Sequence, residues 1–136
     1  MKTEQDIERD FYRFISESEI GRTIRGAIYR EGMRPTNAET EDLVIKFLEG
    51  TDAQFQSGIV VLNLYVPDIP IGGGRKSKDF KRISTLQNAV NSFFDSGCGN
   101  EYDITKDATP KTLRNEDIEQ HFIYVRIKFR RADLYV

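Results

Sequence analysis

Apolar residues recur at the spacing of an amphipathic helix over residues 4–18. This spacing places them in one stripe along the side of a helix that faces a core. The stripe consists of Ile7, Phe11, Phe14 and Ile15. Thr3 is placed to cap the start of the helix, with Asp6 three residues further on, near the positive end of the helix dipole. We expect Gly21 to stop the helix.

A second helix is predicted over residues 79–96, where apolar residues again follow a helical period. Its apolar positions are Phe80, Ile83, Leu86, Val90, Phe93 and Phe94. Gly97 and Gly99 follow the last of these, and glycine is the residue that most often ends a helix. The two main helices therefore flank a long segment in which strand patterns dominate.

Strand patterns occupy residues 23–30, 42–49, 56–66, 100–106 and 120–130. The strongest signal is that of residues 56–66, which are rich in β-branched side chains. In residues 120–130, apolar and polar side chains alternate, which is typical of a half-buried antiparallel strand. One side of it carries Ile123, Val125, Ile127 and Phe129, and the other carries Tyr124, Arg126, Lys128 and Arg130. The resulting order α-β-β-β-α-β-β predicts an α+β fold, with two main helices packed on a mostly antiparallel β-sheet.

The chain length of 136 residues corresponds to one domain, which we assign to residues 1–136. Hydrophobic residues make up 38% of the chain and aromatic residues 11%, which is enough to fill a core. Two segments between the predicted elements lack apolar periodicity. Residues 71–78 are basic and rich in glycine, and residues 108–117 are polar and contain a proline. We expect both segments to be flexible loops.

Composition limits the chemistry available to the chain. The net charge of −2 argues against a general nucleic-acid coat protein, which needs a basic excess. One cysteine excludes an intrachain disulfide, and one histidine leaves little material for a metal site. No apolar run reaches the roughly 20 residues of a membrane-spanning helix, and the first residues lack the apolar stretch of a signal peptide. We therefore expect a soluble, non-enzymatic protein without metal or cofactor.

Residues 72–77, Gly-Gly-Gly-Arg-Lys-Ser, lie between a predicted strand and a predicted helix, as a phosphate-binding loop does. Such a loop requires the spacing Gly-x-x-x-x-Gly-Lys-Ser/Thr, so that successive N–H groups surround the phosphates. In this chain Arg75 separates Gly74 from Lys76, and prolines interrupt the approach from the strand. We interpret the segment as a surface loop that becomes ordered against a partner.

Acidic residues form two groups without the spacing of a catalytic or metal site. The first group is expected to be a solvated helix side and consists of Asp6, Glu8, Asp10, Glu17 and Glu19. The second is expected to be charge at a loop edge and consists of Glu39, Glu41 and Asp42. His121 and Cys98 lack sequence neighbours that would make them a general base or a nucleophile.

The polar side of residues 120–130 is a basic stripe with three open interpretations. Together with Tyr124, its cations suit single-stranded nucleic acid, which is bound through backbone charge and base stacking. The same residues suit a solvated sheet face or an edge protected by charge against uncontrolled pairing. They also suit a subunit interface in which the stripe meets the acidic side of the first helix.

Three segments occur in an order that resembles a known class of proteins. The first is residues 26–35, Gly-Ala-Ile-Tyr-Arg-Glu-Gly-Met-Arg-Pro. It is followed by the pair Glu41-Asp42 at the start of a strand, and then by a strand that ends in Val66-Pro67-Asp68. In this order the segments resemble small tail-completion proteins of phages and prophages, in particular the tail terminators of long-tailed phages. The resemblance covers residues 21–69, and beyond them only the order of the elements agrees.

This resemblance implies a structural protein of the virion tail, made in the cytoplasm of the bacterial host. Tail terminators are small α/β subunits that form a ring, commonly of six, at the head-proximal end of the tail tube. They stop tube polymerisation and offer a surface to the head connector. The implied partners are thus further copies of the chain, the tail tube and head-connector proteins, and no catalytic residue or cofactor is implied.

A ring of identical subunits uses two different patches on each subunit. We expect the interface of this chain, with its own copies or with other partners, to include Arg34, Pro35, Gly73, Arg75, Lys76, Tyr124, Arg126, Lys128 and Arg130. The alternative function is a small nucleic-acid-binding module that uses the basic strand side and the basic glycine-rich loop.

Overall fold

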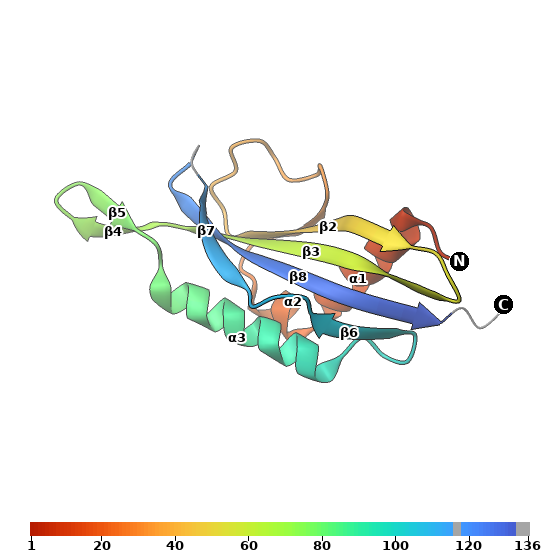
Figure 1. Cartoon of the computed structure of the whole chain (residues 1–136). Helices are drawn as coiled ribbons and strands as arrows, with labels where there is room; N and C mark the ends of the chain where they lie inside the picture. The colour runs from red at the N-terminus through yellow and green to blue at the C-terminus, as the bar shows by residue number, and fades with distance from the viewer. Residues whose placement is uncertain (116–117, 133–136) are drawn as a thin grey trace.

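The computed structural model describes residues 1–115 and 118–132. In this part of the chain, three helices pack on a six-stranded, mostly antiparallel sheet, from which a β-hairpin projects (Figure 1). The helices are α1 (Glu4–Glu17), α2 (Glu19–Thr23) and α3 (Phe80–Ser96). The strands are β1 (Ile28–Arg30), β2 (Asp42–Thr51), β3 (Phe55–Pro67), β4 (Ile69–Gly72), β5 (Arg75–Ser77), β6 (Tyr102–Lys106), β7 (Lys111–Asn115) and β8 (Gln120–Ala132). The predicted α+β fold with two main helices, α1 and α3, is confirmed.

The strands of the main sheet lie in the order β1-β2-β3-β8-β6, and β7 also pairs with β8. All pairs are antiparallel except β1 with β2. The two longest strands, β3 and β8, pair over their whole length, from Phe55 opposite Ala132 to Pro67 opposite Gln120. This central pair joins segments far apart in the sequence and forms the middle of the sheet.

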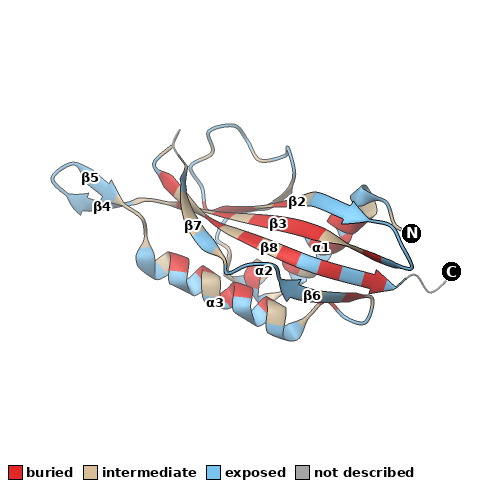
Figure 2. Cartoon of the chain, viewed as in Figure 1, coloured by how far each residue is buried: buried red, intermediate tan, exposed pale blue. Residues whose placement is uncertain are grey.

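The helices cover one face of the sheet, and the opposite face carries no helix (Figure 1). The alternation predicted for β8 sets its orientation, because Ile123, Val125 and Ile127 are fully buried. Figure 2 shows the buried residues along β2, β3 and β8 and on the sides of the helices that face them. One apolar cluster joins α1, α3 and the sheet, and its largest fully buried members include Phe11 and Phe129.

The first helix begins as the sequence indicates and ends differently. Thr3 and Asp6 form a reciprocal capping box at the start of α1. Gly21, however, does not stop a helix, because α2 continues through it to Thr23. A Cβ atom at this position would lie 2.2 Å from the carbonyl oxygen of Ser16. Glycine is therefore needed for the close approach of α2 to the end of α1, and its role is packing rather than termination.

Only the last three residues of the predicted strand 23–30 form a strand, β1. The backbone N–H of Arg25 donates to the carboxylate of Glu41 (2.7 Å), and that of Ala27 donates to the carboxylate of Asp42 (2.9 Å). These side chains satisfy the backbone where a neighbouring strand would otherwise do so. Glu41 and Asp42 are both buried, so the expectation that they are charges at a loop edge is wrong.

Two segments expected to be loops contain strands. Residues 69–77 form the hairpin β4–β5, with its turn at the glycines that follow Ile71. Residues 111–115 form β7, which pairs with β8 at residues 120–124. Strand β6 pairs with β8 only at residues 127–131. Residues 120–124 of the same strand are therefore free to pair with β7. Residues 116–117 of the expected polar loop lie outside the described residues.

Candidate assembly interface

The basic stripe lies on the face of the sheet that no helix covers. Its residues alternate along β8 with the buried ones, as the sequence predicts, and they face the outward residues of β3 in register. We call this surface the open sheet face. It is formed by Ser57, Ile59, Val61 and Asn63 on β3 and by Tyr124, Arg126, Lys128 and Arg130 on β8.

The cations of the open sheet face are partly engaged within the chain. Arg126 donates a hydrogen bond to the carboxylate of Asp107 (2.8 Å) and another to the hydroxyl of Tyr124 (3.3 Å). The bond to Asp107, followed by that to Tyr124, holds the pKa of Arg126 above its usual value. The guanidinium of Arg130 lies 3.7 Å from the centre of the Phe55 ring, and both Arg130 and Lys128 are exposed. The stripe is therefore less available to phosphate groups than its sequence indicates.

Two apolar residues, Ile59 and Val61, are buried at the centre of the open sheet face without a covering helix. Lys128 lies opposite Ile59 and Arg126 opposite Val61 in the β3–β8 ladder. The aliphatic stems of such long side chains cover apolar neighbours while the charged ends stay in water. Nearby, Oδ1 of Asn63 is buried and has no hydrogen-bond partner among the described residues. An unpaired buried oxygen costs about 1–3 kcal/mol, which a donor from another molecule would remove.

Arg34, expected at the interface, is largely engaged by contacts within the chain. Its side chain is 11% exposed and donates to the carboxylate of Asp42 (3.1 Å) and to the carbonyls of Ala38 and Thr40. It also lies over the ring of Tyr65 (4.0 Å). These contacts attach residues 31–41 to the sheet. The neighbouring residue Pro35 is exposed.

The buried carboxylate of Asp42 is stabilised in its charged form. Burial alone raises the pKa of an aspartate, but hydrogen bonds from Thr40, the Ala27 N–H and Arg34 outweigh it. The pKa of Asp42 therefore lies below its usual value. The neighbouring carboxylate, that of Glu41, forms an ion pair with Arg82 (2.6 Å). These two ion pairs attach the chain before β2 to the sheet and to α3.

The acidic side of α1 is not uniformly solvated, contrary to the prediction. Glu8 is buried and accepts a hydrogen bond from Arg30 (2.7 Å). Asp10 is buried as well and binds Lys2 and the hydroxyl of Tyr102 (2.7 Å). Arg30 and Tyr102 lie far from α1 in the sequence, so a helical pattern alone does not reveal them. Glu17 and Glu19, at the end of this acidic series, remain exposed.

The predicted basic loop is an ordered projection, which we call the arm, residues 69–77. All four residues of β4 are exposed, and the exposed fractions of Ile69 and Ile71 are 40% and 49%. The arm pairs with no strand of the main sheet and extends away from it (Figures 1 and 2). At its base, Lys76 forms an ion pair with Glu119 (2.9 Å). Arg75 is exposed.

The geometry of the arm also shows that residues 72–77 do not form a phosphate-binding loop. Gly73 and Gly74 have φ angles of 63° and 71°, the left-handed region that a tight hairpin turn uses. The turn leads into β5, so it is separated from the start of α3 by a strand. A phosphate-binding loop leads directly into a helix N-terminus. The segment is therefore a hairpin turn.

His121 and Cys98 have structural surroundings. His121 Nδ1 lies 2.7 Å from a carboxylate oxygen of Asp68, at the end of β3 where the arm begins. Cys98 is buried, and burial raises the pKa of its thiol to about 12, so the reactive thiolate is scarce near neutral pH. Among residues 1–115 and 118–132, no group of three or more His, Cys, Asp or Glu side chains is placed to hold a metal ion. No helix in the same residues is long and apolar enough to cross a membrane.

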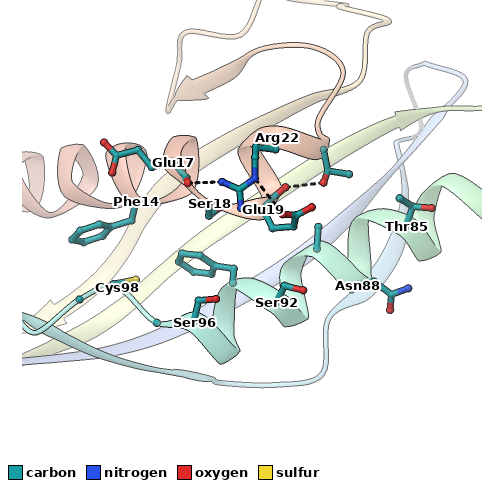
Figure 3. Close-up of a pocket in the computed structure, with 15 residues that line it drawn as sticks. Phe14, Glu17, Ser18, Glu19, Arg22, Thr85, Asn88, Ser92, Ser96 and Cys98 are labelled. Atoms are coloured by element: carbon teal, nitrogen blue, oxygen red, sulfur yellow. Dashed lines mark hydrogen bonds and ion pairs between the residues drawn. The ribbon is translucent and has the colours of Figure 1, made fainter.

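A groove between the α1–α2 junction and α3 was not predicted from the sequence (Figure 3). We call it the helix groove, and its volume is about 690 Å³. Its apolar lining comes from Phe14, Ala89, Phe93 and Cys98. Its polar lining includes Glu17, Glu19 and Arg22 near the junction and Thr85, Asn88, Ser92 and Ser96 on α3. The helical spacing of these small polar residues on α3 is the signal that sequence reasoning missed.

Comparisons with known proteins leave the relationship of this chain to others open. No protein-family model matches the sequence, and a search of the curated proteins found no match. The resemblance to tail terminators therefore stays a prediction.

Proposed function

We propose that this chain is a non-enzymatic structural protein of a phage or prophage tail. In this proposal, copies of the chain form a ring that terminates the tail tube or joins it to the head. Its partners are then other copies of itself, the tail tube and head-connector proteins, and its final location is the virion. The sequence resemblance suggested this function, and the shape of the subunit supports assembly in particular.

The observation that carries the proposal is the arm. An isolated two-stranded hairpin is marginally stable in water, and natural hairpins gain stability by packing on other structure. This arm pairs with no strand of the main sheet, and it exposes Ile69 and Ile71. An ordered projection with exposed apolar residues is a feature of subunits that contact a neighbour.

The open sheet face supports the same proposal from a different part of the subunit. It has an apolar centre at Ile59 and Val61 and a basic border that includes Lys128. A closed ring needs two different complementary patches on each subunit, and the arm and the open sheet face are separate surfaces. In a ring, the arm would reach the neighbouring subunit, and the open sheet face would supply most of the contact area.

The test is native mass measured by light scattering over a concentration series, at low and high salt, with electron microscopy of any large species. The matched variant replaces residues 69–77 with a two-residue turn, which is feasible because Ile69 and Ser77 are paired at the base of the arm. We expect the intact chain to form rings, alone or on tail-tube ends, and the variant to form none while keeping its unfolding temperature. Absence of rings under both conditions would contradict the proposal.

A second candidate function, single-stranded nucleic-acid binding, is favoured by one observation. Tyr124, Lys128 and Arg130 lie on one side of β8, where charge and a stacking surface are combined. The measurement is a gel shift with single-stranded DNA and RNA at low salt. Binding that weakens steeply with salt and is lost in Lys128→Glu would favour this function. The engagement of Arg126 with Asp107 argues against it.

A further inference from the structure

We propose that the arm of one copy lies in the helix groove of a neighbouring copy. This inference rests on the proposed ring and names two surfaces that meet in it. It assigns a role to the helix groove, of whose lining only Glu17 and Glu19 belong to a contact expected from the sequence. The occupant we infer is thus a second copy of this chain rather than a small molecule.

The chemistry of the two surfaces is complementary. The arm presents the exposed apolar side chains Ile69 and Ile71, and the groove has an apolar lining that includes Phe14 and Phe93. Burial of such side chains is the main favourable contribution to protein association. Ile69 and Ile71 would thus gain, against Phe14 at the border of the groove, the burial that they lack within their own chain.

The charges of the arm and of the groove are also complementary. The arm is basic, and its Arg75 is exposed, whereas Lys76 is already paired with Glu119. At the groove, Arg22 is paired with Glu19 (2.9 Å), and the exposed carboxylate of Glu17 has no ion-pair partner among the described residues. Opposite charges at the border of an apolar contact fix its orientation and speed its formation.

Backbone groups of the arm also find partners in the groove. Strands β4 and β5 pair only with each other, so each has one edge of unpaired N–H and C=O groups. The groove presents the exposed side chains of Asn88, Ser92 and Ser96, which make no hydrogen bond within the described part of the chain. Amide and hydroxyl groups both donate and accept, so this row suits the edge of a strand.

The positions of arm and groove favour a contact between two copies over docking within one copy. The arm joins the body just before Asp79, at the start of α3, and extends away from the helices (Figure 1). The groove follows α3 from Thr85 to Gly99, beyond the far end of that helix. The 17 residues of α3 span about 25 Å, and a four-residue strand covers about 13 Å. An arm–groove contact therefore joins two copies through different patches, which is the geometry of a ring.

The experiment is disulfide cross-linking between two variants of the full chain, Ile71→Cys and Ser92→Cys, mixed in equal amounts under mild oxidation. Both variants are made in a Cys98→Ser background, because the native Cys98 lines the groove and could otherwise compete for the cross-link. The control partner is Arg9→Cys, at an exposed position of α1 that lies outside the groove lining and outside the open sheet face. We expect a cross-linked dimer from Ile71→Cys with Ser92→Cys and a background level with Arg9→Cys.

Charge exchange gives a second readout without cysteines. Arg75→Glu and Glu17→Lys should each weaken association by about tenfold, and the two changes combined in one chain should restore it. Rings without the Ile71–Ser92 cross-link would overturn the arm–groove contact and leave the proposed function standing. Absence of both rings and cross-link would overturn both, and absence of restoration in the double variant would contradict the pairing of Arg75 with Glu17.

Discussion

Strand β3 and the arm are consecutive in the chain, separated by Asp68 alone, and their apolar side chains have opposite surroundings. In β3, Val60, Leu62 and Leu64 are fully buried. In β4, Ile69 and Ile71 are exposed although they are residues of the same kind. The cause is the pairing, because β3 lies between β2 and β8 beneath the helices, whereas β4 pairs with β5 alone.

This difference separates residues that stabilise the subunit from residues that are available to a neighbour. Apolar surface in β3 is withdrawn from water by folding, so it contributes to the free energy of unfolding. Apolar surface on the arm stays in water in the isolated subunit, so it contributes only when another molecule covers it. Substitutions in the two regions should therefore change different measured quantities.

The largest effect is expected for Phe129→Ala in β8. Phe129 is fully buried opposite Gly58 of β3 and packs against the rings of Phe11 and Tyr102. Removal of a buried aromatic side chain leaves a cavity and should lower the free energy of unfolding by about 3–5 kcal/mol. Denaturation in urea measures the change. A loss below about 1 kcal/mol would contradict the assignment of this ring to the core.

A smaller effect is expected for Asp42→Asn, at the start of β2. Loss of the charged carboxylate weakens its hydrogen bonds to Arg34, Thr40 and the Ala27 N–H, which should cost about 1.5–3 kcal/mol. Denaturation at neutral pH measures this loss, with Asp103→Asn on the exposed surface of β6 as the matched control.

The same residue predicts a pH dependence of stability. The pKa of Asp42 in the folded chain lies below 3.8, the ordinary value that applies to the unfolded chain. The stabilisation is therefore complete above that value and is lost as the pH falls through the folded-state pKa. Urea titrations between neutral pH and the acid limit should show a decline in the wild type that is shallower in Asp42→Asn. Equal slopes in the two proteins would exclude this role.

The smallest effect on stability is expected for Ile71→Ser on the arm. Its side chain is 49% exposed and lies in a hairpin that pairs with no strand of the main sheet. The free energy of unfolding should therefore change by less than about 0.5 kcal/mol. Association measured by light scattering should nevertheless weaken, because the apolar contact with a neighbour is lost. If stability fell as in Phe129→Ala, the contrast between arm and sheet would disappear.

The elements that were predicted well are those in which local pattern and burial agree. The stripe of α1, the β-branched residues of β3 and the alternation along β8 each indicate both the element and the side that faces the core. The basic stripe was placed correctly on the outward side of β8 for the same reason. These signals are periodic, and periodicity is a property of the chain itself.

What the sequence alone determined is thus the α+β fold, the two main helices and the central strands. Tertiary structure decided the arm, β7, the helix groove and the contacts of Arg34 within the chain, because each depends on segments brought together only by folding. Arg34 is engaged by Asp42 and Tyr65, and Glu8 by Arg30, through contacts that no local spacing encodes. The sequence does not distinguish a charged side chain that is solvated from one that is buried against a partner. Only the folded structure distinguishes these two cases.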